Sequence, residues 1–297
     1  MKKLGIVGLT PLAEAVGKRL LDSGFELLGL IEPERPKTAD LARKLGIPTV
    51  NSRLKLSEWS DGVILFEDQE SQLEKHFLLT TDSLIGPSAK ARVFVVCGTV
   101  FADVLLKLEA KLDRFNAHLV ESCLPSPLGE IGEGKVVVLC GGRDEAVQAA
   151  KPILQALGEE VRHLGELGRA TSMEALIGSI LAVQTAALAE ALALAEASGV
   201  RMDLLRDVFR HLGLLAPRLD RDWECMLKRN YSWSCPCTHT AKTAAIATKL
   251  ARRLRLEVPL INAAKRQFDR MIKAGMGGMD RQAVAELTFR DRTIPPG

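Results

Sequence analysis

The feature that most constrains this fold is a change of pattern near residue 165. Before it, short apolar runs rich in β-branched residues alternate with segments of helical spacing; after it, strand signals stop. Strands that alternate with helices are typical of βαβ units and a parallel sheet. The sequence therefore predicts an α/β domain over residues 1–165, with a doubly wound parallel sheet, followed by an all-α domain over residues 166–297.

The expected elements follow this division. Strands are expected over residues 4–7, 26–31, 48–50, 62–66, 92–97, 118–121, 135–140 and 161–164, and helices between them over 11–21, 38–45, 70–79 and 99–115. Further helices are expected over 171–198, 202–212, 217–228, 240–254, 259–274 and 280–287. The helix over 171–198 is apolar around most of its circumference, so we expect neighbours to enclose it. Polar residues interrupt its apolar stretch, which argues against a membrane span.

Charge and cysteine content narrow the class of protein. The 40 basic and 37 acidic residues give a net charge of +3, with no basic stripe or charge block. The sequence thus predicts no nucleic-acid partner and no membrane partner. The six cysteines in a chain of this length are expected to be thiols rather than disulfides. We expect a cytoplasmic protein.

A candidate phosphate-binding turn follows the first expected strand. The Rossmann fingerprint, Gly-x-Gly-x-x-Gly or Ala, places a dinucleotide's pyrophosphate at a helix N-terminus. Gly8 and Ala13 satisfy its first and last positions, but Thr10 replaces the second glycine, where the phosphate would come close. An ordinary strand–helix turn is an equally good interpretation. The candidate cofactor-binding residues here are Gly8, Leu9, Thr10, Pro11 and Leu12.

The end of the second expected strand bears on the choice of cofactor. Glu32 could accept a hydrogen bond from a ribose 2′-OH and disfavour a 2′-phosphate, which favours NAD over NADP. Arg35 follows closely and could instead bind that phosphate, while Glu32 could be only a solvated turn residue. Phe66 and Glu67, which end the fourth strand, are further candidate cofactor-binding residues.

Several segments in order resemble the β-hydroxyacid dehydrogenase family, which includes 3-hydroxyisobutyrate dehydrogenase and relatives of 6-phosphogluconate dehydrogenase. The matching stretches are Gly141–Gly142, Lys151–Gly158, His163–Gly168 and Ala187–Glu196, and the resemblance covers nearly the whole chain. It implies an NAD or NADP cofactor, a small-molecule substrate, and a homodimer or homotetramer formed through the helical domain.

The family's chemical motifs are altered in this chain. The resemblance places Thr99 near the nicotinamide ribose. It places the family's glycine-rich substrate loop on residues 121–127, in which Pro125, Ser126 and Pro127 are the candidate substrate-binding residues. A proline has no N–H to donate, so a backbone contact to substrate is expected to be lost.

The most consequential change falls on the long helix. The resemblance places the family's catalytic lysine on Glu174 and a substrate-binding asparagine on Gly178, while Lys242 matches a lysine that reaches the cofactor. A glutamate would repel a carboxylate substrate but could act as a general acid. Imine reductases, which resemble the same family, often carry Asp or Tyr there, and an anionic residue suits a cationic iminium. Glu174 could instead simply favour the start of a helix. Glu174 and Lys242 are the candidate catalytic residues.

A cysteine-rich stretch precedes Lys242. Cys235, Cys237 and His239 offer three metal ligands, but their spacing is not a usual zinc pattern, and a fourth ligand would have to come from elsewhere, for example from Cys225. A loop of small residues is the preferred interpretation, with no metal.

Three functions remain open. The first is an NAD(P)-dependent oxidoreductase with an atypical active site, whose substrate is not an ordinary 3-hydroxyacid. The second is a family member that has lost catalysis and serves as a binding or assembly module. The third is an imine reductase-like enzyme.

Overall fold

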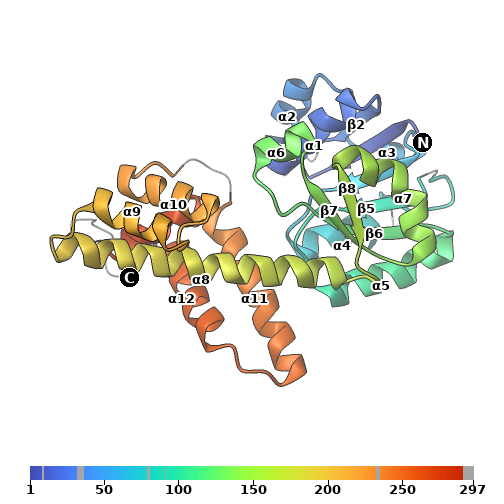
Figure 1. Cartoon of the computed structure of the whole chain (residues 1–297). Coiled ribbons are helices and arrows are strands. Elements are labelled where there is room, and N and C mark those ends of the chain that lie inside the picture. The colour runs from blue at the N-terminus through green and yellow to red at the C-terminus, as the bar shows by residue number, and fades with distance from the viewer. Residues whose placement is uncertain (9, 32–36, 79–80, 90, 232–234, 290–297) are drawn as a thin grey trace. The chain divides into compact units, whose positions relative to one another are not determined.

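The computed structural model describes residues 1–8, 10–31, 37–78, 81–89, 91–231 and 235–289. The chain forms two compact units, Met1–Glu174 and Ala175–Gly297 (Figure 1). The division falls inside a long helix, α8 (Arg169–Ala197), rather than before it. The first turns of this helix therefore belong to the first unit.

The first unit is built on an eight-stranded sheet in the order β3-β2-β1-β4-β5-β6-β7-β8. Neighbouring strands are parallel except β6 and β7. The strands are β1 (Lys3–Val7), β2 (Glu26–Leu30), β3 (Thr49–Val50), β4 (Gly62–Leu65), β5 (Val93–Val96), β6 (His118–Cys123), β7 (Val137–Gly141) and β8 (Glu160–His163). The predicted strands and the doubly wound sheet are confirmed.

Helices cover both faces of the sheet, and each face has its own apolar core. One core receives side chains from α1 (Pro11–Asp22), α2 (Lys37–Leu45), α6 (Leu128–Glu133) and α7 (Asp144–Leu157). The other receives them from α3 (Arg53–Glu58), α4 (Glu70–Leu78) and α5 (Ala102–Leu112). Burial on both faces explains why the central strands are continuous apolar runs rather than alternating ones.

The strand order determines where a ligand can bind. The chain leaves β1 for β2 on one side of the sheet, and β4 then pairs with β1 on the other. The carboxyl ends of strands around such a reversal form the usual binding crevice of open α/β sheets. In this chain those ends carry Gly8, Glu67 and Thr99.

The second unit is helical, as predicted. It contains most of α8 with α9 (Met202–His211), α10 (Pro217–Lys228), α11 (Cys237–Leu254) and α12 (Pro259–Lys273). Its core includes the buried side chains of Leu192, Trp223 and Phe268. The α-helix expected over residues 280–287 is instead a 3-10 helix, η2 (Arg281–Leu287).

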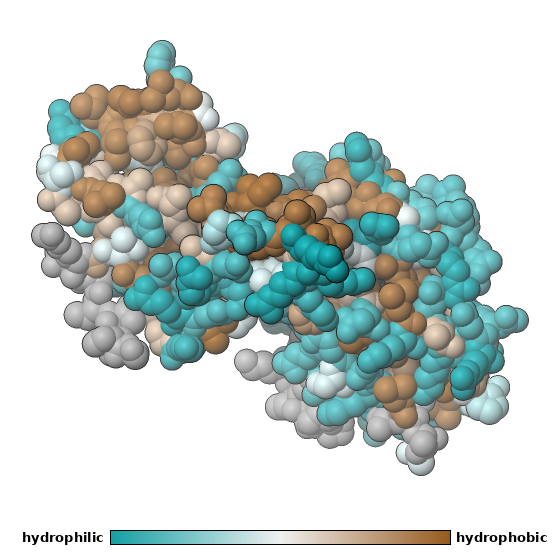
Figure 2. All heavy atoms as spheres, turned by 90° about the horizontal axis from the view of Figure 1, so that it is seen from below, coloured by the Kyte–Doolittle hydropathy of each residue, from teal (hydrophilic) through white to brown (hydrophobic). Residues whose placement is uncertain are grey.

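Apolar side chains are also plentiful on the surface of the helical unit. Leu254, Leu256 and Leu260 at the α11–α12 connection are more than half exposed. Figure 2 shows apolar surface of this kind beside strongly hydrophilic patches. Helix α8 is long and apolar enough to cross a membrane, but core helices of globular proteins meet the same criteria.

Candidate active site

The turn after β1 requires a glycine. Gly8 has φ +75°, in the left-handed region. A Cβ at Gly8 would lie 2.4 Å from the carbonyl oxygen of Phe66 and 3.0 Å from Oε1 of Glu67. The backbones that follow β1 and β4 therefore touch at this point, as the first fingerprint glycine requires.

The N-terminus of α1 is already partly satisfied by the protein itself. Thr10 is the N-cap, and its Oγ1 accepts a hydrogen bond of 3.2 Å from the N–H of Ala13. The first helical residue is Pro11, which has no N–H. In a dinucleotide site these first-turn amides bind the pyrophosphate. Two of the three amide positions at the start of α1 are thus absent or occupied, which should weaken the hold on phosphate.

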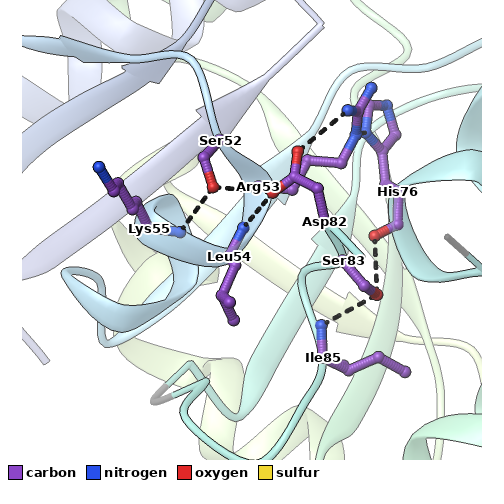
Figure 3. Close-up of polar contacts among 8 residues, drawn as sticks. All are labelled: Ser52, Arg53, Leu54, Lys55, His76, Asp82, Ser83 and Ile85. Atoms are coloured by element: carbon purple, nitrogen blue, oxygen red, sulfur yellow. Dashed lines mark hydrogen bonds and ion pairs between the residues drawn. The ribbon is translucent and has the colours of Figure 1, made fainter. Parts of the chain in front are cut away.

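Glu67, the residue after Phe66, is a buried carboxyl group tied into a polar network. Its Oε1 lies 3.3 Å from Nε2 of His76 on α4. Arg53 donates from Nε to Nδ1 of His76 at 3.0 Å, so the ring proton is on Nε2 and points at Glu67. Asp82 pairs with Arg53 at 3.4 Å (Figure 3). The network holds the carboxyl group of Glu67 beside the candidate phosphate turn, since a Cβ at Gly8 would lie 3.0 Å from its Oε1.

Asp82 also organises the start of α3. Its carboxylate accepts hydrogen bonds from the hydroxyl of Ser52 at 2.8 Å and from the N–H of Leu54 at 3.0 Å (Figure 3). Burial acts to raise the pKa of Asp82, but these bonds and the charge of Arg53 outweigh it and lower the pKa below 3.8. The ionised form of Asp82 is therefore part of the folded structure.

The acidic loop after β4 also shapes the loop after β5. Asp68 accepts a hydrogen bond of 2.9 Å from the N–H of Thr99, and Glu70 accepts one of 3.3 Å from the N–H of Phe101. A Cβ at Gly98 would lie 2.1 Å from the carbonyl oxygen of Glu67. The helix expected from residue 99 begins only at Ala102, after Phe101, which is extended at φ −67° and ψ 138°.

Thr99 and Glu174 meet in the structure. The buried Thr99 hydroxyl donates a hydrogen bond of 2.9 Å to Oε2 of half-buried Glu174. The thiol of Cys123, at the end of β6, is hydrogen-bonded to the same carboxylate. Burial, and then the charges of Glu174 and Glu121, raise the pKa of Cys123, so its thiol stays protonated and donates. Two donors thus converge on a carboxylate at the position where the resemblance implies a lysine.

Reasoning from the sequence missed several of these residues. Cys123, His76 and the buried Glu121 of β6 received no role, although each is tied to a candidate residue or its helix. A polar residue at the end of an apolar strand, as in Leu-Val-Glu-Ser-Cys over residues 119–123, was the available signal. Pro125, Ser126 and Pro127 are half-buried between β6 and α6, and their role in substrate binding stays a prediction.

In the helical unit, Gly178 is explained by packing. A Cβ there would lie 2.5 Å from Oγ1 of Thr243 on α11, so α8 and α11 approach closely at this point. Lys242, the neighbour of Thr243, is half-buried in α11. The predicted roles of Gly178 in substrate binding and of Lys242 at the cofactor remain predictions.

The cysteine-rich stretch does not form a ligand cluster. Sγ of Cys235 lies 3.7 Å from Oγ1 of Thr240, and Sγ of Cys237 donates to the carbonyl oxygen of Asp280. No group of three or more metal-ligating side chains is found in the described part of the chain. All six cysteines are free thiols. Leu9, Glu32 and Arg35 lie outside the described residues.

These contacts fit a nicotinamide dinucleotide in part. Gly8 and the Gly98–Thr99 loop leave backbone close to the crevice, where a side chain at either glycine would collide with Glu67 or its neighbour. The start of α1, capped by Thr10, offers fewer amides to phosphate than the motif requires. The site therefore has the frame of a dinucleotide site, in which the capping Thr10 stands in place of the second fingerprint glycine.

Comparisons with known proteins agree with this frame. Residues 3–165 match the NAD binding domain of 6-phosphogluconate dehydrogenase. Residues 168–288 match the NAD-binding region of NADP-dependent 3-hydroxyisobutyrate dehydrogenase. An L-threonate dehydrogenase of Pectobacterium atrosepticum is 21% identical over 98% of this chain and 95% of its own length.

Solved structures show the same fold. A 3-hydroxyisobutyrate dehydrogenase from Salmonella typhimurium, 21% identical, superposes with a TM-score of 0.81 over 97% of this chain and 100% of its own. An imine reductase from a Pseudomonas species, 16% identical, gives a TM-score of 0.61 over 95% and 98%. Two family matches that together span most of the sequence, on the observed two-unit fold, show that this chain belongs to the NAD(P)-dependent β-hydroxyacid dehydrogenase family of oxidoreductases.

Proposed function

We propose that this protein is an NAD(P)-dependent oxidoreductase with an atypical active site, whose small-molecule substrate is not an ordinary 3-hydroxyacid. The observation that carries the proposal is the carboxylate of Glu174, held by the hydroxyl of Thr99 at 2.9 Å. A substrate carboxylate about 4 Å from Glu174 would be repelled by about 4 kcal/mol at an effective dielectric constant of about 20. That repulsion is comparable with the whole binding free energy of a ligand bound at about millimolar, about 4 kcal/mol.

The same carboxylate favours a substrate that carries positive charge or a proton at the reacting atom. The nicotinamide cofactor, when bound, supplies or accepts hydride. Thr99 and Cys123 orient the carboxylate of Glu174, which can then attract a cationic nitrogen or exchange a proton with it. An imine reductase-like activity, with an iminium substrate and an amine product, is therefore the favoured form of the proposal.

Hydride transfer to a panel of substrates tests this form. Oxidation of NADH and NADPH is followed with cyclic imines and, in separate reactions, with 3-oxoacids of similar size. We expect turnover of imines, and a fall of about 10²- to 10³-fold in kcat for Glu174→Gln, which keeps the shape but removes the charge and proton exchange. Equal turnover by Glu174→Gln, or a preference of the wild type for 3-oxoacids, contradicts the proposal.

Charge reversal provides the matched test of geometry. Glu174→Lys restores the residue that the family resemblance implies, and should lose imine turnover while gaining activity on 3-hydroxyacids. A gain would show that the remaining frame still orients a hydroxyacid. A loss of both activities in a folded variant would show that the altered substrate loop, Pro125–Pro127, also excludes hydroxyacids.

A second candidate function is a binding or assembly module without catalysis. The observation that favours it is the protein's own cap on α1, where Oγ1 of Thr10 occupies the N–H of Ala13. Titration with both cofactors separates the two. If neither NADH nor NADPH binds more tightly than about millimolar, equivalent to about 4 kcal/mol, the oxidoreductase proposal is wrong and the module is favoured.

Other properties belong to the proposal. NAD is the preferred cofactor on the strength of Glu32, which the ratio of the two dissociation constants tests. A cytoplasmic location and a homodimer or homotetramer formed through the helical domain are further expectations. The exposed leucines of that unit, such as Leu256 and Leu260, support an association surface, and light scattering of the purified chain tests it.

A further inference from the structure

Glu121 is a buried carboxyl group whose position needs an explanation. It lies in β6, paired with Val96 of β5 and with Gly141 of β7, and it is 1% exposed. Burial of a carboxylate is unfavourable unless hydrogen bonds compensate for the lost water. The partners of Glu121 therefore indicate what the charge does.

Its hydrogen-bond donors are Gly168, the residue just before α8, and residues of the first turn of α8. Oε1 accepts hydrogen bonds from the N–H of Gly168 at 2.6 Å and of Ala170 at 2.9 Å. Oε2 accepts from the N–H of Thr171 at 3.1 Å and from its hydroxyl at 2.6 Å. The first amides of a helix have no partners within the helix, and the helix dipole favours a negative charge at this end. Glu121 thus caps α8 from a different element of the fold.

The surrounding backbone is shaped to accommodate this contact. A Cβ at Gly141 would lie 2.4 Å from Oε1 of Glu121, so the neighbouring strand must carry glycine. Gly168 has φ +92° and lies against Ala102, where a Cβ would be 2.5 Å from that side chain. The backbone around the Glu121 carboxylate is therefore closely packed, both in the sheet at Gly141 and in the loop before α8 at Gly168.

The contact bears on Glu174, which lies three residues after Thr171. One turn of helix separates the capped amides from the carboxylate that meets Thr99. The first unit ends at Glu174, so the capped turn and Glu174 belong to the same unit as Thr99 and Cys123. Because a helix is rigid over one turn, fixing its first amides also fixes the position of Glu174.

We infer that Glu121 is a positioning residue, which fastens the first turn of α8 to the sheet and so holds Glu174 against Thr99. The anchoring of α8 stands on geometry alone, and only its effect on turnover rests on the proposed function. Charge-assisted hydrogen bonds are stronger than neutral ones, and an amide side chain cannot accept all four bonds. A neutral side chain of the same shape should therefore loosen this turn while leaving the sheet intact.

Amide hydrogen exchange of the intact chain tests the anchoring without any activity. In Glu121→Gln, we expect exchange in the segment 168–174 to be at least about 10-fold faster, with protection of β1, β4 and β5 unchanged. Asp82→Asn is the matched control, since it replaces a carboxylate that caps α3 in the same unit, and it should leave 168–174 unchanged. Equal protection of 168–174 in Glu121→Gln and wild type overturns the inference.

A milder variant keeps the test decisive if Glu121→Gln fails to fold. Thr171→Val removes only the hydroxyl bond at 2.6 Å and should give a smaller acceleration of exchange in the same segment. No acceleration in this variant also counts against the anchor. In either variant, native alkylation should reach Cys123 faster, because the thiol loses the neighbouring Glu174; an unchanged rate at Cys123 would show that Glu174 had not moved.

Kinetics separate positioning from a structural role. On a substrate turned over by the wild type, Glu121→Gln should lower kcat about 10-fold or more, with the KM for the cofactor unchanged, and Glu121→Asp should recover part of it. A rise in the cofactor KM with constant kcat would refute the positioning role. If the wild type turns over no substrate but Glu121→Gln still speeds exchange in residues 168–174, the anchoring role of Glu121 is supported and only the proposed function is refuted.

Discussion

Replacing Thr10 by glycine should tighten the binding of NADH or NADPH, although Thr10 is the N-cap of α1. In the wild type, Oγ1 of Thr10 accepts the hydrogen bond of Ala13 at 3.2 Å, and Pro11 offers no N–H. Thr10→Gly frees the Ala13 amide for a phosphate oxygen. A hydrogen bond to a charged group contributes about 1.5–3 kcal/mol, which corresponds to a dissociation constant lower by about 10- to 160-fold. Replacing the N-cap threonine by glycine should lower the free energy of unfolding by only about 0.3 kcal/mol.

Isothermal titration at constant salt measures this effect, with Thr10→Ser as the control. Serine keeps the capping oxygen and removes the methyl group, so its affinity should stay within about 2-fold of the wild type. If serine tightens binding as much as glycine, crowding by the methyl group and not the cap is responsible. If Thr10→Gly binds no more tightly than the wild type while remaining folded, the reasoning from the capped amide is wrong.

Three further predictions concern stability and thiol reactivity. Asp82→Asn should lower the free energy of unfolding by about 1 kcal/mol near neutral pH. Because the folded pKa of Asp82 is lowered, this difference is present above pH 3.8 and should vanish as the pH falls through the lowered pKa, which denaturant titrations at several pH values check. Native alkylation at mildly alkaline pH, read by mass spectrometry, should label the half-buried Cys225 before Cys123, whose pKa burial and nearby carboxylates raise; earlier labelling of Cys123 would contradict the buried cluster. Gly178→Ala should cost about 1–3 kcal/mol, since its Cβ would lie 2.5 Å from Oγ1 of Thr243, and Thr243→Ala in the same chain should recover most of this loss in thermal unfolding.

The periodicity of the sequence was sufficient for the fold class, although helix α7 (Asp144–Leu157) was not among the expected elements. Strand-length apolar runs separated by helical segments predicted a parallel sheet, and the same edge of such a sheet then had to carry Gly8, Glu67 and Thr99. The family resemblance, counted along the chain from Gly168, also placed Glu174 at the position of the family's catalytic lysine. These properties are local or depend on counting along the chain, so no knowledge of packing was needed.

Helix boundaries that depend on contacts with residues distant in sequence could not be predicted from periodicity. Helix α5 starts at Ala102 rather than residue 99, after the extended Phe101, and the amides of Thr99 and Phe101 donate to Asp68 and to Glu70 at the start of α4. The last predicted helix is a 3-10 helix. Short helices such as α3, whose start depends on Asp82 from a segment nearly thirty residues away, gave no periodic signal.

The phosphate turn and the carboxylates around it show which features the sequence determines and which depend on tertiary contacts. The sequence by itself determined that Thr10 stands in place of a glycine, at the start of a helix that begins with proline. Only the tertiary structure decided that Glu67 is buried beside that turn, that Glu121 caps α8, and that Thr99 and Cys123 converge on Glu174. A carboxylate in a sequence is equally compatible with solvent, and only the donors that folding brings around it determine whether it is a surface charge, a helix anchor or a reactive group.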